Sequence, residues 1–285
     1  MGRAMRLARC LGVLAWLLAS GQAFAGVVSL GSMKPLRSIL PSRPIFAWLP
    51  PGYEGAQRRY PVLYVLDGQN QFDPKRAYAG VTWGLDKSGE AHVRAGHQPF
   101  IAVAVDNALQ QRSDEYLPSR ARQESGAMVG GKLGEFAAFL INQVKPAVDR
   151  EFRTKTGPED TAVLGSSFGG SAAFHLGFGR PDKFRRVAAV SAPFWWNGGE
   201  ALKLVKSAKK KPPIRLWIDM GTREDVETAD AARKQLEGAR EMKSALLKLG
   251  FKEGRDLGYL EDEGAAHSEA AWAQRLPDIL RFLFP

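Results

Sequence analysis

Short apolar segments alternate with amphipathic segments along most of this chain. The central apolar segments, such as "PVLYVL" and "FIAVAV", are nearly continuous runs of Val, Ile, Leu and Ala, which is typical of strands covered on both faces. Apolar residues at helical spacing occupy the segments between them. Strands are expected at residues 45–50, 61–68, 100–107, 161–166, 185–192, 214–221 and 256–263, and helices at 131–152, 167–181, 228–250 and 268–284.

This alternation predicts an α/β protein with a mostly parallel central sheet and helices on both of its faces. Residues 26–67 show no helical pattern, so the first strands should form an antiparallel edge of the sheet. Two long polar connections, 68–99 and 107–131, are typical of functional surfaces. No change of composition marks a second domain, so residues 26–285 are expected to form one domain.

Residues 1–25 have the pattern of a secretory signal peptide. Three arginines precede a short apolar run, and the small-residue sequence "AFA" precedes Gly26. The run is too short to predict a membrane span after cleavage, although an uncleaved anchor is the alternative. The only cysteine, Cys10, lies within this segment, so the mature chain should contain no disulfide. We therefore expect an exported protein, periplasmic or secreted.

The charge is strongly positive. Lys and Arg number 40 against 30 Asp and Glu, a net charge of +10, and without the three arginines of the signal segment it is +7 (37 against 30). Such a charge favours anionic partners. The densest basic run, residues 203–213, has no interleaved aromatic residue and no recognition motif. It is expected to be a solvated loop, and no nucleic-acid partner is predicted.

Between the strand at 161–166 and the helix that follows lies "GSSFG", residues 165–169. It matches G-x-S-x-G, in which a serine stands on a sharp strand-to-helix turn with its hydroxyl exposed at the carboxyl edge of the sheet. Ser167 is therefore the candidate nucleophile. Packing alone is the alternative reason for the glycines.

A serine needs a base to take its proton, and the chain has four histidines. His92 and His97 precede the serine, whereas this motif calls for the order serine, acid, histidine. His175 lies on the helix after the turn. His267 follows the last strand and precedes the last helix, which makes it the candidate base.

The acid should lie on the loop after an intervening strand. In "DMGTREDVE" the loop position favours Glu224, and the adjacent Asp225 is the second candidate. Two backbone amides should stabilise the oxyanion: that of Phe168, after the nucleophile, and that of Gln69, on the loop after the strand at 61–68.

Together these residues resemble the putative esterase (esterase D-like) family of α/β-hydrolases, and most closely its siderophore trilactone esterase branch. The similarity covers nearly the whole mature chain. The segments that carry it are "YPVLYVLDGQNQF", "IAVAVDN", "RSDEYLP", "FLINQVKPAVDREFRT", "VLGSSFGGSAAF", "VSAPFWW", "DMGTRED" and "HSEAAWAQRLPDILRFL".

This resemblance implies an α/β-hydrolase fold and a serine esterase that needs no cofactor and no metal. Arg112 and Tyr116 would lie near the mouth of the active site and could contact substrate, or could form an ordinary salt-bridged loop. Trp195 and Trp196 could line an aromatic substrate pocket or pack in the core. The expected partner is a small-molecule ester, anionic or aromatic.

Three alternatives use the same residues. The triad could transfer the acyl group to another alcohol, or it could act on acetyl or feruloyl esters. The chain could also be a binding protein on a hydrolase scaffold, because a fold does not guarantee an activity.

Overall fold

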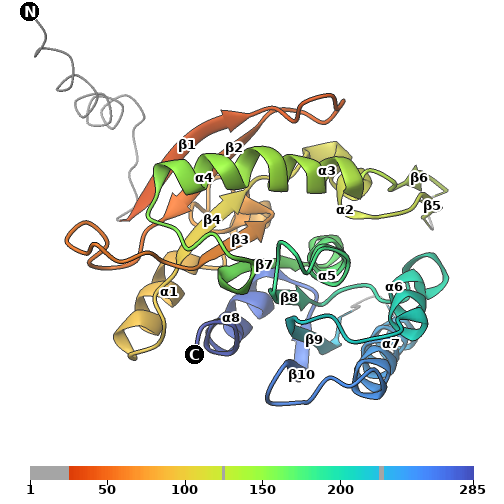
Figure 1. Ribbon diagram of the computed structural model, residues 1–285. Coiled ribbons are helices and arrows are strands. Elements are labelled where there is room, and N and C mark those ends of the chain that lie inside the picture. The colour runs from red at the N-terminus through yellow and green to blue at the C-terminus, as the bar shows by residue number, and fades with distance from the viewer. Residues whose placement is uncertain (1–25, 124–125, 225–227) are drawn as a thin grey trace, which may run out of the picture.

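The computed structural model describes residues 26–123, 126–224 and 228–285. Its centre is an eight-stranded sheet of order β1-β2-β4-β3-β7-β8-β9-β10 (Figure 1). β1, β2 and β4 pair in antiparallel fashion, and every other neighbouring pair is parallel. The sheet strands are β1 (Val27–Met33), β2 (Arg43–Trp48), β3 (Val62–Leu66), β4 (Ile101–Val105), β7 (Thr161–Ser166), β8 (Arg186–Val190), β9 (Arg215–Arg223) and β10 (Leu257–Ala266), and β5 (Ala121–Arg122) and β6 (Met128–Val129) form a separate hairpin.

Helices cover both faces of the sheet (Figure 1). On one face α2 to α7 pack over one apolar cluster, and on the other α1 and α8 pack over a second. The helices are α1 (Leu85–Arg94), α2 (Arg112–Tyr116), α3 (Leu133–Phe139), α4 (Lys145–Glu151), α5 (Phe168–Gly179), α6 (Trp196–Ser207), α7 (Ala229–Lys248) and α8 (Glu269–Leu283). A π-helical segment (Leu140–Val144) joins α3 to α4, and short 3₁₀ turns lie at Gly68–Asn70, Tyr78–Gly80, Leu109–Gln111 and Pro158–Asp160.

The two clusters explain the continuous apolar strands. In β3, Val62, Tyr64 and Leu66 face one cluster, whereas Leu63 and Val65 face the other. Side chains of a strand alternate between the two faces, so a strand covered on both sides needs an apolar residue at every position. The predicted sheet with an antiparallel N-terminal edge is confirmed.

Some elements were not expected from the sequence. β1 is an edge strand with an irregular register between Ser29 and Ser32, and it carries no continuous apolar run. α1 lies inside the connection 68–99, and α2 and the β5–β6 hairpin lie inside 107–131. Short or half-buried elements have weak hydrophobic periodicity, so polar composition alone suggested loops.

The basic run at 203–213 is only partly a loop. Its first residues belong to α6, which buries Ala201 and Val205 in the core while its lysines face solvent. The prediction of a loop for the whole run was therefore wrong. Ala201 and Val205, four positions apart, lie on one face of this helix and pack in the apolar cluster that α7 also covers.

No helix in the described residues is long and apolar enough to cross a membrane. The predicted signal peptide, residues 1–25, lies outside the described residues.

Candidate active site

Ser167 stands alone at the turn between β7 and α5. Its backbone has φ 55° and ψ −127°, a conformation that costs free energy for any residue with a side chain. The Ser167 amide donates a hydrogen bond of 2.9 Å to the carbonyl of Val190, at the end of the neighbouring strand β8. The turn is therefore held in place by the sheet, at the carboxyl edge of its parallel strands.

Close packing explains the first glycine of the "GSSFG" segment. A Cβ atom on Gly165 would lie 2.3 Å from the carbonyl oxygen of Gly169, inside van der Waals contact with backbone that cannot move freely. The end of β7 thus approaches the first turn of α5 too closely for any other residue. This close approach makes the turn sharp enough to leave Ser167 by itself between strand and helix.

Glu224 and His267 are brought together by strand register. β9 and β10 are parallel neighbours, and Arg223 at the end of β9 pairs with Ala266 at the end of β10. Glu224 directly follows β9 and His267 directly follows β10. His267 Nδ1 lies 2.6 Å from Glu224 Oε2. Asp225, the second candidate acid, lies outside the described residues.

The Glu224 side chain is buried, and both of its oxygens are hydrogen-bonded. Oε1 accepts from the Ser191 hydroxyl and from the Gly221 amide, each at 2.6 Å. Burial alone would raise the pKa of Glu224, but the hydrogen bond and charge of His267, with these two other donors, outweigh it. The pKa of Glu224 therefore lies below its ordinary value, and the carboxylate stays ionised at neutral pH.

The His267 ring is partly open to solvent, with 33% of its side chain exposed. Trp272 on α8 packs edge-on against it, with ring centroids 4.8 Å apart and an angle of 86°. No hydrogen bond joins the His267 ring to the Ser167 hydroxyl in the described part of the chain. Such contacts often shorten only when substrate binds.

The Gln69 turn follows β3 at the same edge of the sheet. Asp67 begins it with a left-handed backbone, φ 55°, and Gln69 is the central residue of the 3₁₀ turn. The Gln69 side chain accepts a hydrogen bond of 3.2 Å from the Asn107 amide, which links the turn to the loop after β4. Phe168 is the first residue of α5, so its amide has no partner within the helix.

Arg112 contacts the first residue of this turn, Asp67. Its guanidinium makes two hydrogen bonds with the Asp67 carboxylate, at 2.7 and 2.8 Å, and a longer one with the carbonyl of Ser166 at 3.4 Å. Asp67 is 4% exposed, so the pair is buried on the carboxylate side. Through Nε and Nη2, Arg112 thus connects the Gln69 turn with the turn at Ser167.

Tyr116 is fully buried, with 0% exposure. Its hydroxyl accepts a hydrogen bond of 3.1 Å from the Asp67 amide. The expectation that Tyr116 contacts substrate is corrected by this burial, because a side chain without accessible surface supports the turn instead of meeting a ligand. The salt-bridged alternative for "RSDEYLP" agrees better with the structure.

The two tryptophans occupy different environments. Trp195 is 48% exposed, whereas Trp196 is 5% exposed and packs against Phe168, with ring centroids 5.3 Å apart. Trp196 therefore packs against the turn at Ser167 and stabilises it. Of the two tryptophans, only Trp195 is exposed enough to contact a ligand. The exposed tryptophan lies on the connection between β8 and α6, just before α6.

Sequence reasoning missed the buried polar residues around Glu224. Ser191, which follows β8, meets Asp219 of β9 and Arg275 of α8 only in the folded chain. An unusual signal was present in the sequence: Arg275 stands on the apolar face of the last helix, between Trp272 and Ile279. A buried charge on such a face requires a partner.

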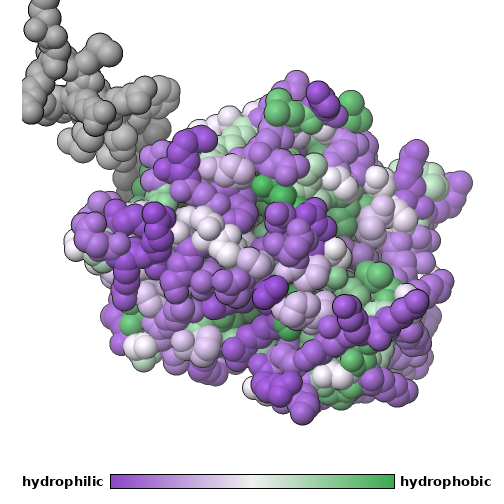
Figure 2. Space-filling model, viewed as in Figure 1, coloured by the Kyte–Doolittle hydropathy of each residue, from purple (hydrophilic) through white to green (hydrophobic). Residues whose placement is uncertain are grey.

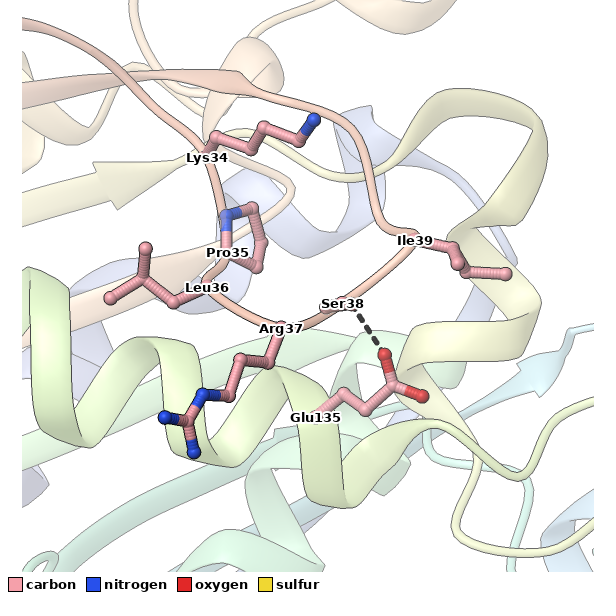
Figure 3. Close-up of a pocket in the computed structure, with 7 residues that line it drawn as sticks. All are labelled: Lys34, Pro35, Leu36, Arg37, Ser38, Ile39 and Glu135. Carbon is pink, nitrogen blue, oxygen red and sulfur yellow. Dashed lines mark hydrogen bonds between the residues drawn. The ribbon is translucent and has the colours of Figure 1, made fainter.

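A surface groove of about 590 Å³ lies elsewhere, between the β1–β2 connection and α3 (Figure 3). Leu36 and Ile39 are 75% and 72% exposed there, and an apolar area over this connection is visible at the top of Figure 2. None of the candidate catalytic residues lines the groove. Within the described residues there is also no group of three or more His, Cys, Asp or Glu arranged to hold a metal ion.

The sheet order, the strained serine between β7 and α5, and the acid and histidine after β9 and β10 define an α/β-hydrolase. Residues 38–283 match the model of the family described as "Putative esterase". The chain belongs to this family.

Three relatives illustrate the range of the family. An uncharacterised protein, YbbA of Bacillus subtilis, is 23% identical over 83% of this chain and 90% of its own. An endo-1,4-β-xylanase/feruloyl esterase of Xylanibacter ruminicola is 26% identical over 83% of this chain, and an iron(III) enterobactin esterase of Dickeya dadantii is 30% identical over 50% of it. The matched region spans 28% of the length of each of these two enzymes.

Solved structures show the same fold. The BES protein from Bacillus cereus superposes with a TM-score of 0.72 at 21% identity, covering 93% of this chain and 98% of that protein. An IroE-like serine hydrolase from Shewanella oneidensis gives a TM-score of 0.67 at 22% identity, covering 90% and 79%.

Proposed function

We propose that this protein is a serine hydrolase of carboxylic esters. Ser167 is the nucleophile, His267 the general base and Glu224 the acid that orients the imidazole. The observation that carries the proposal is the 2.6 Å contact of Glu224 with His267 Nδ1, at the sheet edge where Ser167 occupies its strained turn. Membership of the esterase family supports the same reaction.

The contact with Glu224 determines the role of each nitrogen of the imidazole. The buried carboxylate accepts a hydrogen bond from Nδ1–H, so Nε2 is the nitrogen left with a free lone pair. In the proposed reaction Ser167 Oγ attacks the ester carbonyl and its proton passes to Nε2. The amides of Gln69 and Phe168 donate to the oxyanion that forms.

Collapse of this intermediate releases the alcohol, which takes the proton from His267, and leaves the acyl group on Ser167. Water then attacks the acyl-enzyme through the same base, and the carboxylic acid leaves. All atoms come from ester and water, so the reaction needs neither a cofactor nor a metal.

An aromatic or apolar substrate is supported by the side chains on the loops at this edge of the sheet. Tyr78, Leu109 and Trp195 are 73%, 77% and 48% exposed. Two of these loops are linked to the Gln69 turn: the Tyr78 amide donates to Asn70, and the Leu109 amide donates to Asn107, whose own amide donates to Gln69. We propose that these loops form the substrate-binding surface, because large exposed apolar residues that lie together are typical of such a surface.

Siderophore-type esters fit this surface and the positive charge of the chain, since ferric catecholate complexes are aromatic and anionic. The enterobactin esterase among the relatives supports the same class. Such a role would also suit an exported protein, and we propose that residues 1–25 direct the chain to the periplasm or the outside of the cell.

The test is a hydrolysis screen of the purified mature protein on short acyl, feruloyl and ferric-siderophore esters, with products identified by mass. Ser167→Ala should lose activity by about 10⁴-fold or more, whereas Ser207→Ala, an exposed serine on α6, should keep it. A fluorophosphonate should label Ser167 and no other residue. Hydrolysis that survives Ser167→Ala would refute the serine mechanism, and a folded protein inert on every ester would favour a binding protein.

Product masses in the same screen, repeated with an added alcohol, also show whether the acyl group is transferred to that alcohol. An ester of that alcohol exceeding the free acid would make the protein an acyltransferase with the same nucleophile.

A further inference from the structure

Ser191 connects the two halves of the candidate site. It follows the last residue of β8 and is fully buried, with an unusual backbone φ of 44°. The preceding carbonyl, of Val190, accepts the Ser167 amide, and the Ser191 hydroxyl itself donates to Glu224. One short segment at the end of β8 therefore contacts both the turn of the nucleophile and the carboxylate.

The hydrogen bonds of the Ser191 hydroxyl determine the direction of its proton. Trp272 Nε1 lies 3.0 Å and Arg275 Nη1 2.9 Å from Ser191 Oγ, and both groups can only donate. They fill the two lone pairs of the hydroxyl oxygen. The single remaining proton must point to Glu224 Oε1, 2.6 Å away.

We infer that Ser191 is a positioning residue for the proposed esterase, which orients Glu224 through a hydroxyl whose direction Trp272 and Arg275 set. The inference rests on the proposed function. Oε1 of Glu224 is held by this hydroxyl and by the Gly221 amide, so Oε2 is the oxygen presented to His267. The carboxylate cannot rotate without breaking both bonds, and the imidazole keeps its proton on Nδ1.

Arg275 adds charge to this arrangement. It is 2% exposed, bonds to Asp219 at 2.7 Å and Asp262 at 2.8 Å, and places Nη2 3.6 Å from Glu224 Oε1. Its cation thus lies among three carboxylates and contributes a favourable charge interaction to each of them, Glu224 included.

The backbone of Ser191 suggests the variant that separates activity from stability. A φ of 44° suits glycine better than any residue with a side chain, so Ser191→Gly removes the hydroxyl while relieving backbone strain. We expect Ser191→Gly to remain folded and to lower kcat by about 10- to 100-fold with little change in KM, since one hydrogen bond to a charged group is lost. Ser191→Ala should show the same kinetic defect with lower stability.

A proton NMR signal distinguishes a positioning role of Ser191 from a purely structural one, because the loss of a purely structural group would leave this signal unchanged. The Nδ1 proton of His267 should resonate far downfield in the wild type and vanish in His267→Gln. In Ser191→Gly it should shift upfield or broaden. The matched control is Thr161→Val, which removes another buried hydroxyl, bonded to the Gly157 carbonyl at 2.8 Å, and should leave kcat and the signal unchanged.

The outcomes separate the two proposals. If Ser167→Ala abolishes hydrolysis but Ser191→Gly keeps the wild-type kcat and signal, the role of Ser191 is refuted and the esterase stands. If Ser167→Ala has no effect, the proposed function itself fails, whatever Ser191→Gly does.

Discussion

Replacing Arg112 by alanine separates two roles for this side chain. As a substrate contact, Arg112 would contribute to binding and little to the folded state. In the structure it instead makes a two-bond pair with the buried Asp67 and reaches the Ser166 carbonyl. Arg112→Ala should therefore disturb the Gln69 turn and the Ser167 turn together.

The size of the effect follows from burial. Removing one partner of a fully buried ion pair costs about 3–5 kcal/mol. Arg112 keeps 27% of its side chain exposed, and Asp67 would retain the hydrogen bond from Asn107 at 2.6 Å, so we expect about 2 kcal/mol, within the range for a lost charged hydrogen bond. For a domain of this size that lowers Tm by roughly 4–8 °C.

Activity should fall because the oxyanion donor moves. The loss of one such donor costs about 10²- to 10³-fold in kcat, so we expect about 10²-fold for a displaced turn, with KM changed less than about 3-fold. Thermal unfolding and steady-state kinetics on one ester measure both quantities. Arg94→Ala is the control, since Arg94 is 69% exposed in a surface pair and should change the free energy of unfolding by less than about 0.5 kcal/mol. A variant with wild-type Tm and kcat but a raised KM would show that Arg112 binds substrate.

Three further predictions concern Glu224, the helix α5 and Trp195. A carboxylate whose pKa is lowered in the folded state stabilises the fold above its unfolded pKa of about 4.3, and this stabilisation is lost as the pH falls through the folded pKa. Chemical denaturation should therefore show that the difference in unfolding free energy between wild type and Glu224→Gln shrinks below about pH 4. A difference that grew below this pH would contradict the lowered pKa of Glu224. Gly177→Ala should destabilise by about 1–3 kcal/mol, because its Cβ would lie 2.1 Å from Val187 Cγ2, and an unchanged Tm would show that α5 shifts freely. Trp195→Ala should lower kcat/KM for aromatic esters roughly 3- to 10-fold relative to acetyl esters, and an equal loss on both would rule out an aromatic contact.

The strands and the turn at Ser167 could be predicted because each obeys a local rule. A strand buried on both faces must be apolar throughout, and β7 was expected at the residues where it lies, Thr161–Ser166. At the turn, the packing of Gly165 against Gly169 admits no side chain. The helices α1 and α6 were not predicted, because each buries few apolar residues and so shows few apolar positions at helical spacing.

The candidate acid was narrowed to two neighbours, because spacing along the loop cannot say which carboxylate meets the histidine. The register of β9 against β10 brings Glu224 to His267. The family resemblance of "RSDEYLP" allowed Arg112 and Tyr116 either to contact substrate or to form an ordinary salt-bridged loop. In the folded chain they turn inward to Asp67, a contact 45 and 49 residues away in sequence.

The amino-acid sequence by itself determined the α/β class, the esterase family and the serine at the turn, because hydrophobic periodicity and glycine sterics act over a few neighbouring residues. The tertiary structure alone decided which polar groups are buried together. Ser191, Glu224 and Arg275 come from three separate elements and meet only after the sheet has formed. Their hydrogen bonds depend on strand register and on helix packing; the local sequence shows that Arg275 needs a buried partner, but it does not show which residues those partners are.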